Sequence, residues 1–146
     1  DAVKLSLKLW TPWLEEKVNG PEKAMKSLDD IEEGSIPDKL SYYFRVYKAS
    51  LLYKLGDHKG AASAYREFLD RIMENEDLPL KLKEVTRSAL ESAESGEIHK
   101  STDNFQKIME LTRANRDALS EEMPFVDVDH HLLSAIYSVY YGRSVK

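Results

Sequence analysis

Residues 49–69 read ASLLYKLGDHKGAASAYREFL, and this stretch indicates the fold more clearly than any other. Apolar residues recur at every third or fourth position on both sides of Leu55-Gly56-Asp57, which is the period of an α-helix and not of a strand. Glycine tolerates the left-handed backbone that ends many helices, so Gly56-Asp57 turns the chain into a second helix. The stretch therefore predicts a helical hairpin.

Outward from this turn, the same period predicts seven helices joined by short connections. Their approximate ranges are 2–18, 21–33, 38–55, 58–74, 79–95, 101–119 and 127–141. The helix at 38–55 carries apolar residues around its whole circumference, which is typical of a helix wedged between neighbours. We therefore predict one all-α domain over residues 1–146. Its hairpins cover about 2–33, 38–74 and 79–119, and a final helix at about 127–141 caps the last hairpin.

The first hairpin repeats in the second when the chain is shifted by 37 residues. The shift places Trp10 on Tyr47, Leu14 on Leu51, Val18 on Leu55, Ala24 on Ala61, Leu28 on Tyr65 and Ile31 on Phe68. A period of this length is typical of stacked helical repeats.

The stretch 49–69 resembles a tetratricopeptide repeat. The residues that carry the resemblance are the small Ala49 and Ala61, the Leu55-Gly56-Asp57 turn, and the packing residues Tyr65 and Phe68. The resemblance implies antiparallel helix pairs stacked as a right-handed superhelix, which holds a protein or peptide on its concave surface. The alternative is an irregular helical bundle in which Leu-Gly-Asp is only a turn.

The resemblance also implies a set of groove positions. Carried onto the second hairpin, they fall on Tyr43, Val46, Ser50, Tyr53 and Lys54, and the 37-residue shift adds Ser6, Leu9, Trp13, Glu16 and Lys17. Relatives that bind chaperone C-termini carry Lys and Asn where Val46 and Ser50 stand, so we do not expect that specialised role. An aromatic anchor beside lysine suits a peptide with an acidic or C-terminal carboxylate group. The alternative is that these side chains only pack against neighbouring helices.

Composition excludes several classes of function. The 21 basic and 26 acidic residues give a net charge of −5 without a long basic block, which argues against nucleic acid as a partner. Lys or Arg interrupts even the aromatic stretch 42–55, so we predict no membrane span. The lack of cysteine excludes disulfides, thiol nucleophiles, zinc fingers and iron–sulfur clusters.

One acid–histidine cluster invites a search for a metal site or catalysis. Asp127 and His131 are four residues apart, with Asp129 and His130 between them, but no second pair of ligands accompanies them. No phosphate-binding glycine loop, Gly-x-Ser-x-Gly elbow or His-Glu-x-x-His motif is present. We therefore predict no metal, no cofactor and no enzymatic activity.

These observations predict a scaffold that binds a protein or peptide. The alternative function is a structural or oligomerisation segment of a larger envelope or signalling protein. The tyrosine-rich stretch 136–141 fits a capping helix, or else a surface that forms a homodimer. The absence of cysteine and of an initiator Met favours an exported, periplasmic protein with a cleaved signal over a cytoplasmic fragment.

Overall fold

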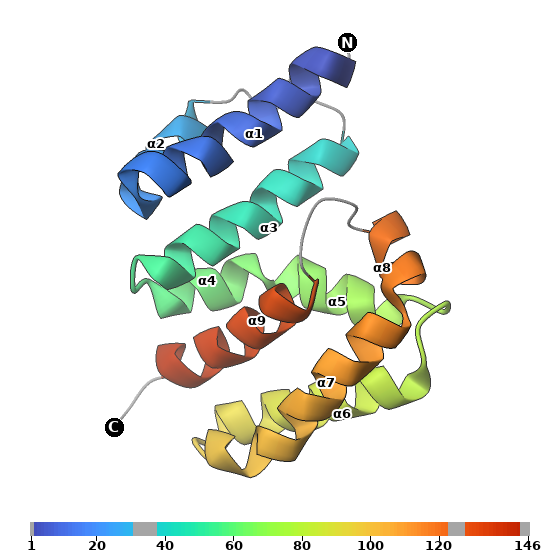
Figure 1. The fold of residues 1–146 in the computed structure, drawn as a ribbon. Coiled ribbons are helices and arrows are strands. Elements are labelled where there is room, and N and C mark those ends of the chain that lie inside the picture. The colour runs from blue at the N-terminus through green and yellow to red at the C-terminus, as the bar shows by residue number, and fades with distance from the viewer. Residues whose placement is uncertain (1, 31–37, 123–127, 144–146) are drawn as a thin grey trace.

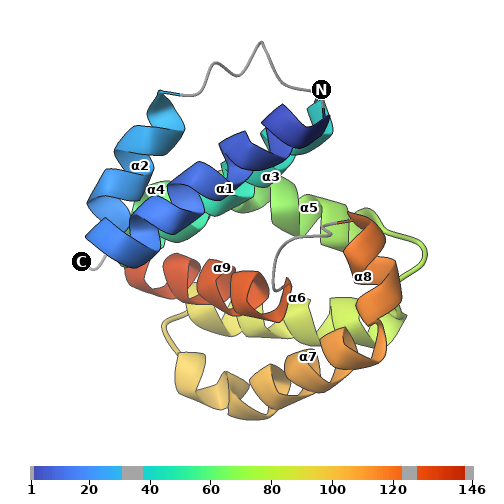
Figure 2. The same cartoon turned by 45° about the horizontal axis from the view of Figure 1, so that its top comes forward.

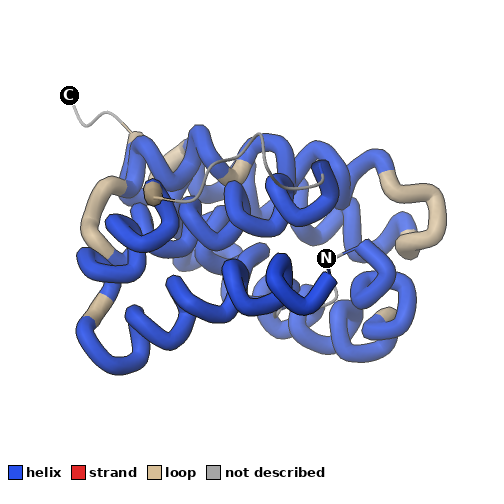
Figure 3. Tube along the Cα trace, turned by 90° about the horizontal axis from the view of Figure 1, so that it is seen from above, coloured by secondary structure: helices blue, strands red, loops and turns tan. Residues whose placement is uncertain are grey.

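The computed structural model describes residues 2–30, 38–122 and 128–143. In these residues all regular secondary structure is helical, as Figure 3 shows, so the predicted all-α class is confirmed. The helices are α1 (Ala2–Asn19), α2 (Pro21–Asp29), α3 (Asp38–Lys54), α4 (His58–Ala64), α5 (Arg66–Glu74), α6 (Leu80–Glu94), the 3₁₀ helix η2 (Ile98–Ser101), α7 (Thr102–Ala114), α8 (Arg116–Glu122) and α9 (Val128–Gly142).

The turn between α3 and α4 follows from its sequence. Gly56 has a φ of 87°, a conformation that costs glycine little, and the amide of Asp57 donates to the carbonyl of Leu52 at 2.9 Å. The Asp57 side chain then accepts from the amide of Gly60 at 3.0 Å and caps α4. The predicted end of one helix and the start of the next are confirmed here.

Two helices that the sequence predicts as continuous are divided in the structure. The helix expected at 58–74 is broken at Tyr65 into α4 and α5, and the one expected to end near 119 is broken at Asn115 into α7 and α8. The predicted helix at 21–33 ends at Asp29, and residues 31–33 lie outside the described part of the chain.

The first two hairpins pack through a small core between α2 and α3. Ala24 and Leu28 of α2 are buried against Phe44 and Leu51 of α3, and Tyr47 lies against the same cluster. We call these contacts the α2–α3 core. The small Ala24 lets the helices approach closely, while the larger residues fill the remaining space.

A larger core joins the remaining helices around α9. Figures 1 and 2 show α9 lying between α4 on one side and α6 on the other, and it also contacts α3 and α7. Its buried residues occupy more than one face and are Val128, His131, Leu132, Ser134, Ala135, Ile136 and Ser138.

The sequence predicts that the last helix caps the hairpin at 79–119; α9 contacts α6 and α7 of that hairpin, and it also packs against α3 and α4. It fills the space between that hairpin and the preceding one, because it is apolar on two faces and carries small residues that allow close contact. An added Cβ at Gly142 would lie 3.0 Å from the backbone of Lys59, which shows how closely α9 approaches α4.

Candidate functional site

Three of the predicted groove residues are inaccessible. Tyr43 and Val46 belong to the main core, and Ser50 is also buried. Ser50 lies beside the Tyr65 hydroxyl together with Ser134 of α9, and hydrogen bonds from both serines offset part of the rise that burial causes in the Tyr65 pKa. These positions therefore face the protein's own helices, as in the alternative interpretation.

Glu16 and Lys54, two further predicted residues, form an ion pair that joins the first hairpin to the second. The Glu16 carboxylate of α1 accepts hydrogen bonds from Lys54 Nζ and, at 2.7 Å, from the Tyr47 hydroxyl of α3. Burial raises the pKa of Glu16, but the bonds from Lys54 and Tyr47 outweigh it, so the pKa lies below its usual value. The charge of Lys54 is thus already matched within the chain.

Trp13 and Lys17 lie together on α1. The ammonium of Lys17 is 5.5 Å from the centre of the Trp13 ring, and the rings of Trp10 and Trp13 meet edge to face at 5.1 Å. Trp10 and Trp13 are both exposed large hydrophobic residues. The side chains of Ser6 and Leu9, the other two positions expected on this helix, lie outside the described part of the structure.

Tyr53, another predicted residue, belongs to a chain of aromatic ring contacts. From Tyr53 of α3, ring contacts continue to His58 of α4 at 5.2 Å, and from His58 to Tyr141 of α9 at 5.1 Å. Tyr141 stacks on Tyr137 at 6.0 Å, and Tyr137 contacts Phe105 of α7 at 5.4 Å. We call these five rings the aromatic row. It crosses the four helices α3, α4, α9 and α7.

The row combines apolar faces with polar tips. Tyr141 is 54% exposed, and the other four members are partly buried. Burial raises the pKa of Tyr53, and the phenols of Tyr141 and Tyr137 raise it further, so the Tyr53 hydroxyl is a neutral donor and acceptor at physiological pH.

A cation lies near Tyr141, the exposed middle ring of the row. The ring of Tyr140 contacts that of Tyr141 at 5.0 Å, and the guanidinium of Arg143 lies 4.2 Å from the centre of the Tyr140 ring. Arg143 also donates a hydrogen bond to the backbone oxygen of Tyr140 at 2.6 Å. The middle of the row therefore lies near a positive charge, which is held close to the face of the Tyr140 ring.

The sequence indicates only part of this row. The tyrosines at 137 and 141 share one face of a helix, and Tyr53 follows from the resemblance. No pattern in the sequence connects these tyrosines with His58 or Phe105, because the ring contacts between them depend on α9 lying beside α4 and α7.

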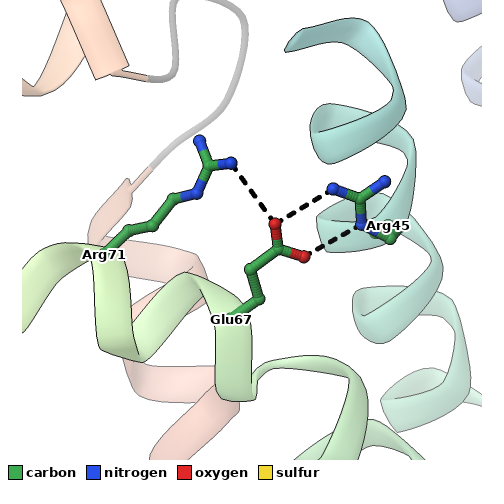
Figure 4. A network of polar contacts seen from close by, with 3 residues as sticks. All are labelled: Arg45, Glu67 and Arg71. Carbon is green, nitrogen blue, oxygen red and sulfur yellow. Dashed lines mark hydrogen bonds and ion pairs between the residues drawn. The ribbon is translucent and has the colours of Figure 1, made fainter. Parts of the chain in front are cut away.

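A separate polar cluster links α3 to α5 and has a structural explanation. Figure 4 shows Glu67 between two arginines: Arg45 donates through two nitrogens at 2.9 and 3.0 Å, and Arg71 donates at 3.3 Å. The pKa of Glu67 lies below its usual value, chiefly because of the hydrogen bond from Arg45. Arg71 also lies 3.7 Å from the centre of the Tyr42 ring.

The predicted acid–histidine cluster is not assembled by the described residues. His131 is buried, its Nδ1 lies 2.9 Å from the Tyr65 hydroxyl, and Asp127 is outside the described part of the chain. Within 2–30, 38–122 and 128–143, no group of three or more His, Cys, Asp or Glu side chains is placed to hold a metal ion. None of the helices described there is long and apolar enough to span a membrane.

Comparison with known proteins finds no match: no family model, no curated protein and no solved structure is similar to this chain.

Proposed function

We propose that the protein is a non-enzymatic interaction module that binds a peptide or a protein segment along the aromatic row. The observation that carries this proposal is the continuity of five rings across α3, α4, α9 and α7, with Tyr141 half exposed at the surface. Aromatic residues with a polar tip are enriched at protein interfaces, since they supply apolar area and a hydrogen bond together.

The construction of the row favours binding over a purely structural role. Each ring is held by its neighbours and rises from a helix, so the surface loses little conformational entropy when a partner binds. The packed helices that carry the rings provide the rigid frame. A partner would pack on the ring faces and accept or donate hydrogen bonds at the phenol tips of Tyr53 and Tyr141.

The experiment is capture of a partner from an extract of the source organism, followed by titration with substituted proteins. Tyr141→Ala removes the most exposed ring and is expected to weaken binding roughly 5- to 30-fold, which corresponds to about 1–2 kcal/mol. Leu80→Ala is the matched control, because Leu80 is an exposed apolar residue on α6 outside the row. Equal affinity of Tyr141→Ala and the wild type, with both proteins folded, would refute the proposal.

The alternative, an oligomerisation segment that dimerises through α9, makes a different prediction. Sedimentation of the chain without a partner should show a monomer if the row binds another protein. A dimer that Tyr141→Ala dissociates would instead assign the row to self-association.

A further inference from the structure

The outer face of α1 is a second apolar surface, separate from the aromatic row. Trp10 is 46% exposed, Leu14 is 52% exposed and Val18 is 77% exposed, and Trp13 lies on the same helix. The spacing of these four residues places them along one side of α1. Contiguous exposed apolar side chains of this kind mark interaction sites. We call these residues the α1 stripe.

The internal repeat shows what such a face contacts elsewhere in this protein. The 37-residue shift places Trp10 on Tyr47 and Leu14 on Leu51. On α3 these equivalents belong to the α2–α3 core, where helix α2 covers them and leaves Leu51 0% exposed. Trp10 and Leu14 thus occupy positions that α2 covers on α3, but among the described residues both are exposed on α1.

Other positions of the two helices keep the same environment under the shift. Pro12 is buried, as is its equivalent Ala49, and Lys17 is exposed, as is its equivalent Lys54. Trp10 and Leu14 differ from their equivalents at positions that α2 covers on α3, and Trp13 differs from Ser50, which is buried beside Ser134 of α9.

We propose that the α1 stripe is the docking surface for a helical hairpin of a partner protein, whose second helix packs on α1 as α2 packs on α3. The docking helix would carry a small residue and a leucine four positions apart, as α2 does at Ala24 and Leu28. The small residue allows close approach, and the leucine fills the space beside Leu14. This proposal is independent of the aromatic row, because α1 contributes no residue to the row.

A second copy of this chain is a poor occupant. The outward face of α2 carries exposed charged residues, and its apolar residues Ala24 and Leu28 are already buried against α3. Another copy would have to detach α2 from its own core before it could present that helix. Docking between copies would therefore break one helix–helix interface for each equivalent interface that it forms.

The test uses a hairpin of known chemistry as the probe. A fusion carries a second copy of residues 1–37 in front of the intact chain, with Trp10, Trp13 and Leu14 of the added copy changed to Gln. Tryptophan fluorescence then reports only on Trp10 and Trp13 of the original α1. A matched control fusion also carries Ala24→Lys and Leu28→Lys in the added copy. Fusion raises the effective concentration of the probe and compensates for weak docking.

Acrylamide quenching of the tryptophans is expected to be at least twofold weaker in the first fusion than in the control fusion, with emission shifted to shorter wavelength. Leu14→Lys in the original α1 should abolish this difference while leaving the circular dichroism spectrum unchanged. Equal quenching in the two fusions would overturn the proposal. It would also be overturned if the unfused chain sediments as a dimer that Leu14→Lys dissociates, since a second copy would then cover the stripe.

Discussion

The imidazole of His131 should make the protein less stable as the pH falls from 7 to 5. His131 is a buried residue of α9, and its Nδ1 lies 2.9 Å from the hydroxyl of Tyr65, at the junction of α4 and α5. Its ring is 6.1 Å from that of Phe68 on α5. Burial, with smaller contributions from the charges of His130 and Lys54, lowers the pKa of His131 to about 3.

The size of the effect follows from the difference between the folded and unfolded chains. An unfolded histidine has a pKa of about 6.5, so between pH 6.5 and 3 the unfolded state binds a proton that the folded state does not. The free energy of unfolding therefore decreases as the pH falls through this window. Integration from pH 7 to pH 5 gives a loss of roughly 2 kcal/mol from this one group. Glu16 and Glu67 have pKa values below the usual range of a carboxyl group, so they contribute little above pH 5.

The assay is urea unfolding followed by circular dichroism at pH 7, 6 and 5. His131→Asn retains a polar group near the Tyr65 hydroxyl but does not titrate, so this variant should lose less than about 0.5 kcal/mol over the same range. His130→Asn is the control, because His130 is exposed on the same helix and its replacement should leave the wild-type pH dependence in place. The reasoning is wrong if His131→Asn and the wild type lose equal stability between pH 7 and pH 5.

Other substitutions test the packing and the surface charges. Ala61→Leu should lower the free energy of unfolding by roughly 1–3 kcal/mol because Ala61 is fully buried on α4, while Ala64→Leu, at a half-buried position, should cost less in the same urea assay. Gly142→Ala should cost about 1 kcal/mol in thermal unfolding, since the new Cβ would lie 3.0 Å from the Lys59 backbone, which cannot rotate away as a side chain can. Glu67→Gln should lower the free energy of unfolding by at most about 1 kcal/mol. The difference from wild type should largely vanish in 1 M NaCl, because the Arg45–Glu67 ion pair is partly exposed and salt screens it.

The parts of the fold that depend on residues adjacent in the sequence could be predicted. The α3–α4 turn needs a residue that accepts a positive φ and a side chain that caps the next helix, and the consecutive residues Gly56 and Asp57 supply both. The short hairpin connection at Gly20 and Pro21 is explained in the same way, with Pro21 at the first position of α2.

The helix breaks at Tyr65 and Asn115 have weaker signals in the sequence. Backbone hydrogen bonds continue on both sides of Tyr65, from its amide to Ala61 and from Leu69 to its carbonyl, so the break there is a distortion and not a turn. No glycine or proline marks it. At Asn115 the side chain donates to the carbonyl of Leu111 at 2.8 Å, and such competition with the backbone is the one local signal that the sequence offered.

The position of α9 could not be predicted, because it is decided by packing between segments far apart in the chain. Its periodicity shows that it is helical and apolar, but a helix with two apolar faces can lie at the end of a stack or inside it. The close approach at Gly142 and the small buried residues Ala135 and Ser138 favour the inner position, and their significance is visible only once α4 and α6 are known to be the neighbours.

This placement of α9 also explains why the predicted groove residues divide into buried and accessible ones. The register of the tetratricopeptide repeat assigns Ser50 to a ligand, yet in this chain Ser50 and Ser134 of α9 both lie at the Tyr65 hydroxyl, so a helix of the protein itself occupies that side of α3. Tyr53 lies one turn further along α3, where its partly buried ring forms part of the aromatic row with His58 and Tyr141. The side of α3 at Ser50 is thus covered by α9, whereas the row that includes Tyr53 and His58 reaches the surface at Tyr141, which is 54% exposed.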